Sequence, residues 1–214
     1  MPPRPAKAST ERDWLRPSKG EERRADLLHA LEGMLAERRL AEIGVDDIAG
    51  AAGVRRTAFY FYFANKAAAV AALLEDAFDA LIAGAQDFLG RGGDPIEALR
   101  DALTALWESW RVRRSVMLAM FDARDIDESV RGIWDEWLES FVEPVGAVVR
   151  EERATGRAPA GPDPAVLVRL LVGMNASALE RWCRGGHDEV PADVVEGMVH
   201  VWVTALYGRA DAQT

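Results

Sequence analysis

The sequence predicts an all-α fold, because apolar residues recur at helical spacing along most of its 214 residues. The alternation of apolar and polar residues that marks half-buried strands is hard to find. Breaks are few, and the clearest are the glycine-rich stretch 90–95 and the proline-rich stretch 156–164. These observations indicate long helices, and a chain of this length can enclose a substantial core.

Charge is divided unevenly along the chain, whose formal net charge is −9. Residues 1–66 hold 12 Lys and Arg against 10 Asp and Glu, whereas residues 67–214 hold 14 against 25. A small basic segment on an acidic body is the asymmetry expected of a protein that meets nucleic acid with one end. The excess of two positive charges is modest, so the positions of the arginines are more informative than the net charge.

Composition favours a cytoplasmic protein without a membrane segment, cofactor or metal. No secretory signal opens the sequence, and no apolar run approaches about 18 residues. Cys183 is the single cysteine, which excludes an internal disulfide, and beside Trp182 on an apolar helix we expect it to be a buried, inert thiol. The three histidines have no metal-ligand spacing, and no phosphate loop or nucleophile motif appears, which argues against an enzyme.

The N-terminal third divides into an arm and three short helices. Residues 1–20 predict a disordered basic arm, since they hold four prolines and a net charge of +3. Helices should follow at 21–39, 45–52 and 55–63, and together they delimit a first domain of residues 21–66. The first two helices open with paired acidic residues, which suit the positive end of the helix dipole.

A second domain, residues 67–210, should be a bundle of longer helices. Asn65 is the expected N-cap of the first of them, whose apolar face carries Val70 and Leu74. Pro144 lies inside a long apolar pattern and should kink that helix or split it in two. The remaining expected helices cover residues 95–113, 115–123, 129–155, 165–184 and 190–207.

Residues 48–66, IAGAAGVRRTAFYFYFANK, have the pattern of a helix-turn-helix that binds DNA. The glycine at 53 permits a sharp bend between two short helices. Phe59 and Phe63 are four residues apart and share a face that can anchor the second helix to the core. Arg56 and Tyr60 share a different face and are free to meet DNA. A surface helix with chance arginines is the alternative.

Gly53-Val54, the aromatic run 59–63 and Lys66 resemble the signature of the TetR-type transcriptional regulators. The segment 200–208 and the pair Met174-Asn175 are similar to the ethionamide-resistance regulator branch of that family. The resemblance implies a ligand-responsive repressor that binds a palindromic operator in double-stranded DNA as a dimer. The residues that it implies face DNA are Arg55, Arg56, Thr57, Tyr60, Tyr62 and Lys66.

Three positions in the turn depart from the family pattern. Arg55 stands where serine is usual, Thr57 where glycine or proline is usual, and Ala58 where threonine is usual. An operator sequence therefore cannot be carried over from relatives. The same departures support an alternative function, a regulatory or scaffold protein of this fold that has lost sequence-specific operator binding.

Six of the seven tryptophans lie within residues 67–214, which indicates a cavity for an apolar ligand. A tryptophan stripe that only fills the core is the alternative. The resemblance implies a pocket for a small hydrophobic effector, with Asn175 as its polar anchor. Val172 and Glu180 replace a second asparagine and an aromatic residue of that branch, so the ligand itself is not carried over. The implied lining is Leu99, Leu103, Leu106, Trp110, Trp134, Leu138, Phe141, Asn175 and Trp202.

The last two helices carry apolar faces, and the resemblance implies that they form a four-helix bundle with a second copy. Such a homodimer would set two recognition helices about 34–36 Å apart, the repeat of the major groove. An effector that changed this spacing would release DNA. The expected members of the apolar faces are Val166, Leu170, Met174, Val194, Met198, Val201 and Ala205.

Overall fold

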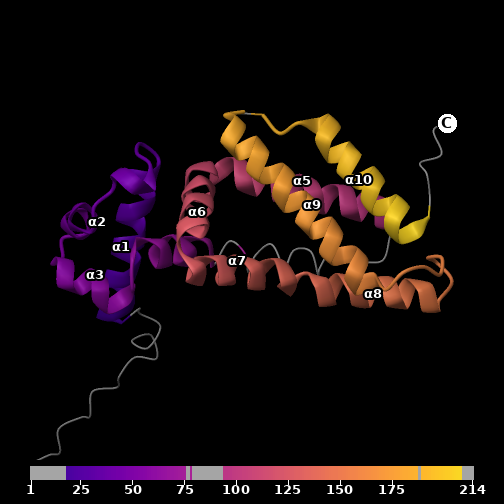
Figure 1. Cartoon of the computed structure of the whole chain (residues 1–214), viewed down its shortest axis with the longest axis horizontal. Helices are drawn as coiled ribbons and strands as arrows, with labels where there is room; N and C mark the ends of the chain where they lie inside the picture. The colour runs from indigo at the N-terminus through magenta and orange to yellow at the C-terminus, as the bar shows by residue number, and fades with distance from the viewer. Residues whose placement is uncertain (1–17, 76–77, 79–93, 188, 209–214) are drawn as a thin grey trace, which may run out of the picture.

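The computed structural model describes residues 18–75, 78, 94–187 and 189–208, and these residues form helices joined by turns, without a strand among them. The expected all-α fold is confirmed. Figure 1 shows a group of short helices at one end, here called the head, beside a larger bundle, here called the body. The head comprises α1 (Lys19–Leu35), the 3-10 turn η2 (Leu40–Glu42), α2 (Val45–Ala51) and α3 (Arg56–Tyr62).

The first helix begins earlier than expected. Ser18 is its N-cap: its Oγ accepts from the Glu21 amide at 3.2 Å, and its own amide donates to Glu21 Oε2 at 2.6 Å. This reciprocal pair satisfies two amides that the helix leaves without partners. Lys19 and Gly20, expected in the arm, are therefore helical, and residues 1–17 of that arm lie outside the described residues.

The helix-turn-helix has the geometry that its sequence predicts. Gly53 adopts a φ of +67°, a left-handed conformation that strains residues with a Cβ, and it turns the chain between α2 and α3. Phe59 is 0% exposed, and Phe63, the extended residue that follows α3, is buried beside it, so two rings anchor the end of this helix. Ile48 on α2 is also fully buried. The opposite face of α3 is left at the surface.

Asn65 joins the head to the body. Its Oδ1 accepts from the Ala68 amide at 2.8 Å, so it caps the helical segment Lys66–Glu75 as expected. Its Nδ2 donates to Asp127 Oδ2 at 2.8 Å, and Asp127 itself caps the helix that begins at the next residue. A hydrogen bond from the Ser129 hydroxyl and the bond from Asn65 lower the pKa of Asp127. Because Asn65 and Asp127 are both N-caps, the hydrogen bond between them connects the starts of two helices.

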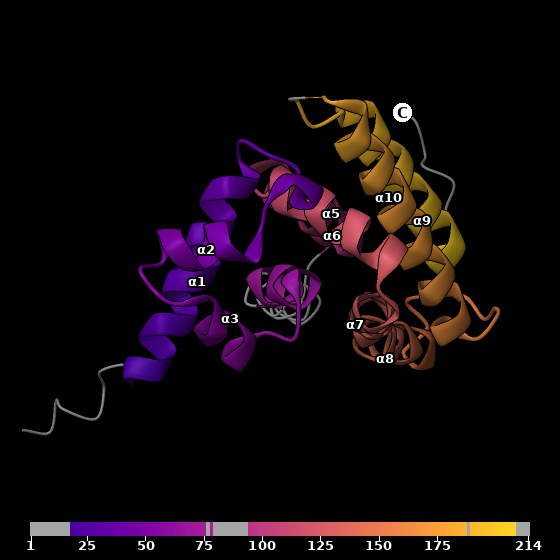
Figure 2. The same cartoon turned by 60° about the vertical axis from the view of Figure 1, so that its left-hand side comes forward.

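The body is a bundle in which sequence-distant helices lie side by side (Figures 1 and 2). The contacting pairs include α8 with α9 and α5 with α10, while α1 and η2 touch α6 and so seat the head on the bundle. Its helices are α5 (Pro95–Val112), α6 (Arg114–Ile126), α7 (Glu128–Ser140), α8 (Val142–Ala154), α9 (Pro164–Gly185) and α10 (Ala192–Tyr207).

The helix expected over residues 129–155 is split, as Pro144 predicts. α7 ends at Ser140, four residues before the proline, and α8 begins at Val142. A proline ring clashes with the carbonyl four residues earlier and lacks the amide that would bond to it. The break therefore falls at Phe141 rather than at Pro144 itself, and in Figure 1 α8 continues from α7 along the lower edge of the body.

No single helix in the described part of the chain is long and apolar enough to cross a membrane. Only the pair Arg56–Tyr62 and Lys66–Glu75 reaches the required length and composition when taken together, and it is bent by 55°.

We expect Phe59→Ala to destabilise the protein by about 3–5 kcal/mol, because it empties a fully buried site in the head. Phe61→Ala is the matched control on the same helix, since Phe61 is 82% exposed, and it should change stability by no more than about 0.5 kcal/mol. Urea unfolding followed by circular dichroism at one protein concentration measures both. Equal losses would show that α3 is not held by this ring.

Candidate DNA-binding face and ligand region

The exposed face of α3 collects most of the residues expected to face DNA. Arg55, Arg56 and Thr57 are exposed at its start, and Tyr60 is 46% exposed one turn later. Tyr62 is half-buried and packs against the core of the head. The arrangement brings two guanidinium groups, a hydroxyl and a phenol to one surface, which suits contacts to base edges and phosphates.

Phe61 is not among the residues expected to face DNA, because its ring has no hydroxyl that could donate to a phosphate. It lies between the two buried rings in sequence, but its side chain is 82% exposed on the predicted recognition helix. The signal was available: residues two positions from a buried pair point away from it on a helix. An exposed aromatic ring at this place can contact a thymine methyl group.

Arg56 is held by a partner that the sequence did not reveal. Its Nη1 forms an ion pair with Asp46 at the start of α2, and its Nη2 donates to Tyr60 Oη at 3.0 Å. The hydrogen bond to Asp46 raises the pKa of Arg56. The guanidinium is therefore oriented across the α2–α3 surface before any ligand arrives. Asp46 belongs with the candidate interface as a positioning residue.

Lys66 is placed differently from the expectation that it contacts a phosphate. Its Nζ donates to the carbonyl oxygens of Leu40 at 2.8 Å and Ile43 at 2.6 Å. The ammonium is half-buried and braces the turn that leads into α2. Leu40 and Ile43 lie 26 and 23 residues before Lys66 in the sequence, so the spacing of residues within the helix-turn-helix motif could not predict this contact.

Part of the implied ligand lining lies in an aromatic cluster of the body. The ring centroids of Trp110 and Trp134 are 5.9 Å apart, and those of Trp137 and Phe141 are 5.1 Å apart. Trp137 links the two pairs, at 5.2 Å from Trp134, although it was not among the implied lining residues. Leu138 lies beside this cluster, half-buried.

Asn175 and Trp202 also belong to the implied ligand lining, and their side chains form a hydrogen bond with each other. The indole Nε1 of Trp202 donates to Asn175 Oδ1 at 3.2 Å, and both side chains are buried. The Oδ1 of Asn175 therefore accepts from an indole of the same chain. On α5, Leu103 is buried and Leu99 and Leu106 are half-buried. That these residues line one pocket stays a prediction.

Three buried indole groups have no hydrogen-bond acceptor among the described residues. They are the Nε1 atoms of Trp107, Trp110 and Trp137. A buried donor without a partner costs about 1–3 kcal/mol, so an acceptor supplied from outside the chain would be favoured there.

A chain of ion pairs runs from the aromatic cluster to the head. Arg124 lies 5.4 Å from the ring centroid of Trp134 and bonds Glu180 at 2.9 Å. Arg184 bonds the same Glu180 at 3.0 Å and also Asp122 at 3.1 Å. Burial favours protonated Glu180, but hydrogen bonds from Arg124 and Arg184 outweigh it and lower the pKa of Glu180.

The last link of that chain is Arg39, at the start of η2, which reaches Asp122 at 3.1 Å. Glu180, one of the departures from the branch pattern, is therefore the centre of a polar path between α6, α9 and the head. Its neighbour in this region, Cys183, is buried, and burial raises the pKa of the thiol to about 12. The thiol is thus protonated at neutral pH, as expected of an inert cysteine.

We expect Lys66→Ala to destabilise the head by about 1–3 kcal/mol, because two carbonyl oxygens lose a charged donor. The salt dependence of binding to random duplex DNA should stay the same, because no phosphate contact is removed. Urea unfolding and fluorescence anisotropy across a salt series measure the two effects. If stability is unchanged and the slope of log K against log salt falls by about one, Lys66 contacts a phosphate of the DNA after all.

Comparison with known proteins agrees with this geometry. Residues 99–208 match the family model "Transcriptional regulator EthR, C-terminal domain", and residues 27–73 match "Bacterial regulatory proteins, tetR family". The HTH-type transcriptional regulator EthR of Mycobacterium tuberculosis is 32% identical over 197 residues, which are 91% of each chain.

Solved structures share the fold at lower identity. The fatty acid degradation regulator FadR from Bacillus halodurans has a TM-score of 0.71 and 16% identity, over 90% of this chain and 97% of that one. FadR from Bacillus subtilis in complex with stearoyl-CoA has a TM-score of 0.69 and 16% identity, over 86% and 98%. From its matching domains and its curated relative, the chain belongs to the TetR family of bacterial transcriptional regulators, with a C-terminal domain of the EthR type.

Proposed function

We propose that this regulator is a repressor that binds a palindromic operator through α3 as a homodimer and is released by a small hydrophobic effector. The observation that carries the proposal is the surface of α3, where Arg55, Arg56 and Thr57 are exposed while Phe59 holds the helix to the core. TetR-family transcriptional regulators are not enzymes, so the function is sought in binding.

The effector side of the proposal is supported by the aromatic cluster and its unpaired donors. The rings of Trp110, Trp134 and Trp137 offer apolar surface, and two of these side chains have buried Nε1 groups without acceptors in the described part. An elongated apolar molecule that carries an acceptor oxygen would satisfy both features. The Bacillus subtilis FadR structure contains stearoyl-CoA, and acyl-CoA thioesters are therefore the first compounds to screen here.

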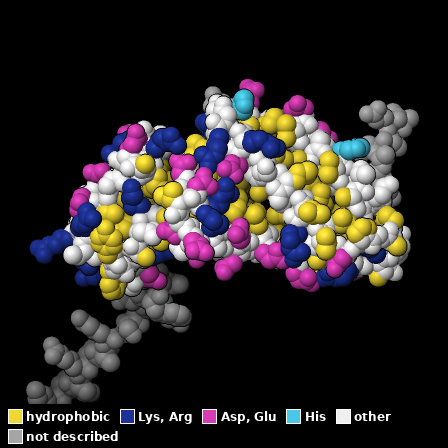
Figure 3. Space-filling view, in the orientation of Figure 1, with side chains coloured by type: hydrophobic (Ala, Val, Ile, Leu, Met, Phe, Trp, Pro, Cys, Tyr) yellow, Lys and Arg dark blue, Asp and Glu magenta, His cyan; other side chains and the backbone are white. Residues whose placement is uncertain are grey.

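The dimer is supported by apolar side chains at the surface of the last two helices. Leu170 is 67% exposed on α9, Val166 is exposed one turn before it, and Val194 and Val201 are exposed on α10. Figure 3 shows apolar side chains gathered over this part of the body. Met198, expected in the same face, is instead buried within the protomer. A patch of this kind on a regulator is typical of a homodimer interface.

Selection of binding sites from random duplex DNA tests the function directly, with the winning site measured by fluorescence anisotropy across a salt series. An enriched palindrome, bound far more tightly than scrambled DNA, supports the operator-binding repressor. Weak binding with one salt slope for every sequence supports instead the protein that has lost operator recognition. The selection is repeated after ligand is stripped under denaturing conditions and the protein is refolded, because a copurified effector would also abolish enrichment.

We expect Arg56→Ala to weaken binding to the selected site by about 1–3 kcal/mol and to relax the base preference at one position. The reason is that the exposed guanidinium, oriented by Asp46, is available to a base edge. Arg150→Ala is the control, since Arg150 pairs with Glu143 on α8, outside the head. A uniform loss across all DNA sequences would assign Arg56 to phosphate contact.

We expect Leu170→Glu to convert the protein to a monomer, because it places a charge in the centre of the proposed apolar interface. Light scattering after size exclusion measures the mass. Ile126→Glu is the matched control, since Ile126 is an exposed apolar residue at the end of α6, and it should leave the mass unchanged. A monomeric unmodified protein would remove the dimer from the proposal.

A further inference from the structure

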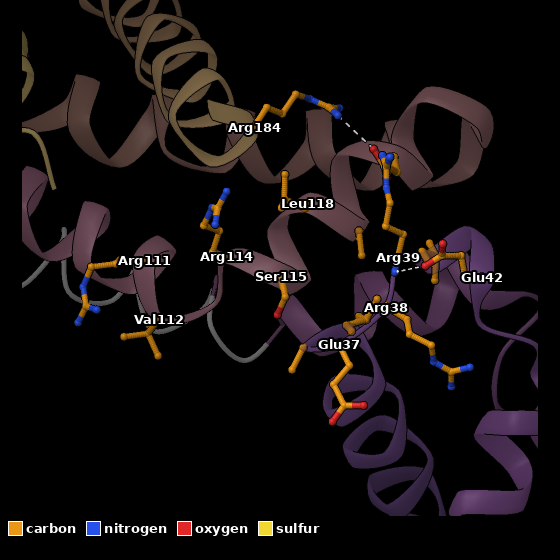
Figure 4. A pocket seen from close by; sticks show the side chains of 15 residues that line it. Glu37, Arg38, Arg39, Glu42, Arg111, Val112, Arg114, Ser115, Leu118 and Arg184 are labelled. Atoms are coloured by element: carbon orange, nitrogen blue, oxygen red, sulfur yellow. Dashed lines mark hydrogen bonds and ion pairs between the residues drawn. The ribbon is translucent and has the colours of Figure 1, made fainter. Parts of the chain in front are cut away.

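A cleft of about 750 Å³ lies between the head and the body. One wall is the corner where α1 ends and η2 begins, and the other is the junction of α5 with α6. Figure 4 shows Arg111 and Val112 on one side, Arg38 and Arg39 on the other, and Arg114 between them. The lining contains no residue of α2 or α3, so a molecule in the cleft leaves the DNA-binding face open.

The charged side chains that line the cleft are mostly arginines. Five arginines and three carboxylates line it, whereas residues 67–214 as a whole hold 14 basic against 25 acidic side chains. Two of the arginines, Arg39 and Arg184, converge on Asp122 at 3.1 Å each, and Arg184 is also paired with Glu180 and Asp125. Arg38 is paired with Asp47 at 3.7 Å and Arg111 with Glu108 at 2.6 Å, so every lining arginine except Arg114 has a carboxylate partner among the described residues.

Arg114 has the least compensated charge in the cleft. It is half-buried at the first position of α6, and its Nε and Nη2 donate to the carbonyl oxygen of Cys183 at 2.9 and 2.7 Å. That acceptor is neutral, and no carboxylate pairs with Arg114 in the described ranges. A guanidinium has five N–H donors in a planar fork, so three remain for an anion.

The cleft also has an apolar part. Val112 is 73% exposed beside the arginines, and Leu118 on α6 is half-buried in the same lining. The volume lies within the range of pockets that hold small metabolites, about 300–1,000 Å³. Inorganic phosphate alone would leave these side chains and most of the space unused.

We propose that this cleft binds a phosphorylated metabolite of nucleotide size, a second ligand site separate from the proposed effector pocket. Its phosphates contact Arg114 and Arg39, whose side chain is 75% exposed, and its ring covers Val112 and Leu118. Arginine forks match phosphate oxygens bidentately, which explains the residue type. The ligand would touch the head and the body at once and compete with Asp122 for Arg39, so its occupancy bears on how the head is held.

Isothermal titration of the free protein with ADP, adenosine and pyrophosphate tests the proposal. We expect ADP to bind at least ten times more tightly than either of the other two compounds. Arg114→Gln, which retains a donor for the Cys183 carbonyl, and Arg39→Gln should each weaken ADP binding at least tenfold. Arg150→Gln on α8 is the matched control and should leave ADP affinity unchanged.

The proposed site would be ruled out if ADP gave no heat up to millimolar concentration, or if adenosine or pyrophosphate bound as tightly as ADP. It would also be ruled out if both cleft variants bound ADP with unchanged affinity. Arg39 is exposed, so Arg39→Gln keeps the test decisive even where Arg114→Gln unfolds the protein. DNA is absent from the titration, and failure here is therefore independent of operator binding.

Discussion

The placement of the DNA-binding head depends on two adjacent side chains, Asn65 and Lys66. Asn65 caps the helical segment that follows α3 and donates to Asp127 at the start of α7. Lys66 turns back to the carbonyls of Leu40 and Ile43, ahead of α2. The bonds of Asn65 join the starts of two helices, and those of Lys66 join one of these helices to the η2 turn, so together they help to set the direction of α3 relative to α7. A displacement of α7 by an effector would reach the recognition helix by this short route.

Polar contacts between head and body set geometry more than stability. The pair that links Arg39 of the head to Asp122 of the body is partly exposed, and such pairs contribute about 0–1 kcal/mol each. Fully burying one large apolar side chain contributes about 1.5–3 kcal/mol, so the buried tryptophans and phenylalanines dominate the stability of the body. Weak, directional links between two well-packed units would permit the relative shift that the proposed release by an effector requires.

The sequence predicted well those features of the fold that interactions between neighbouring residues determine. The helical spacing of apolar residues predicted the head and the body helices to within a few residues, and Pro144 predicted the split between α7 and α8. The capping box of Ser18 and Glu21 was present in the sequence and was missed, so α1 began two residues earlier than expected. On α3, periodicity predicted the buried face at Phe59, whereas the exposed ring of Phe61 was not predicted.

The sequence by itself determined the all-α class, the bend at Gly53 and the exposed arginines of α3, because spacing, φ preference and charge are properties of neighbouring residues. Only the tertiary structure decided the partners of long polar side chains. Lys66 binds carbonyls of a distant turn, Arg56 binds Asp46, and Asn175 binds an indole 27 residues away. Such side chains reach several partners, and the packing of helices far apart in sequence selects among them.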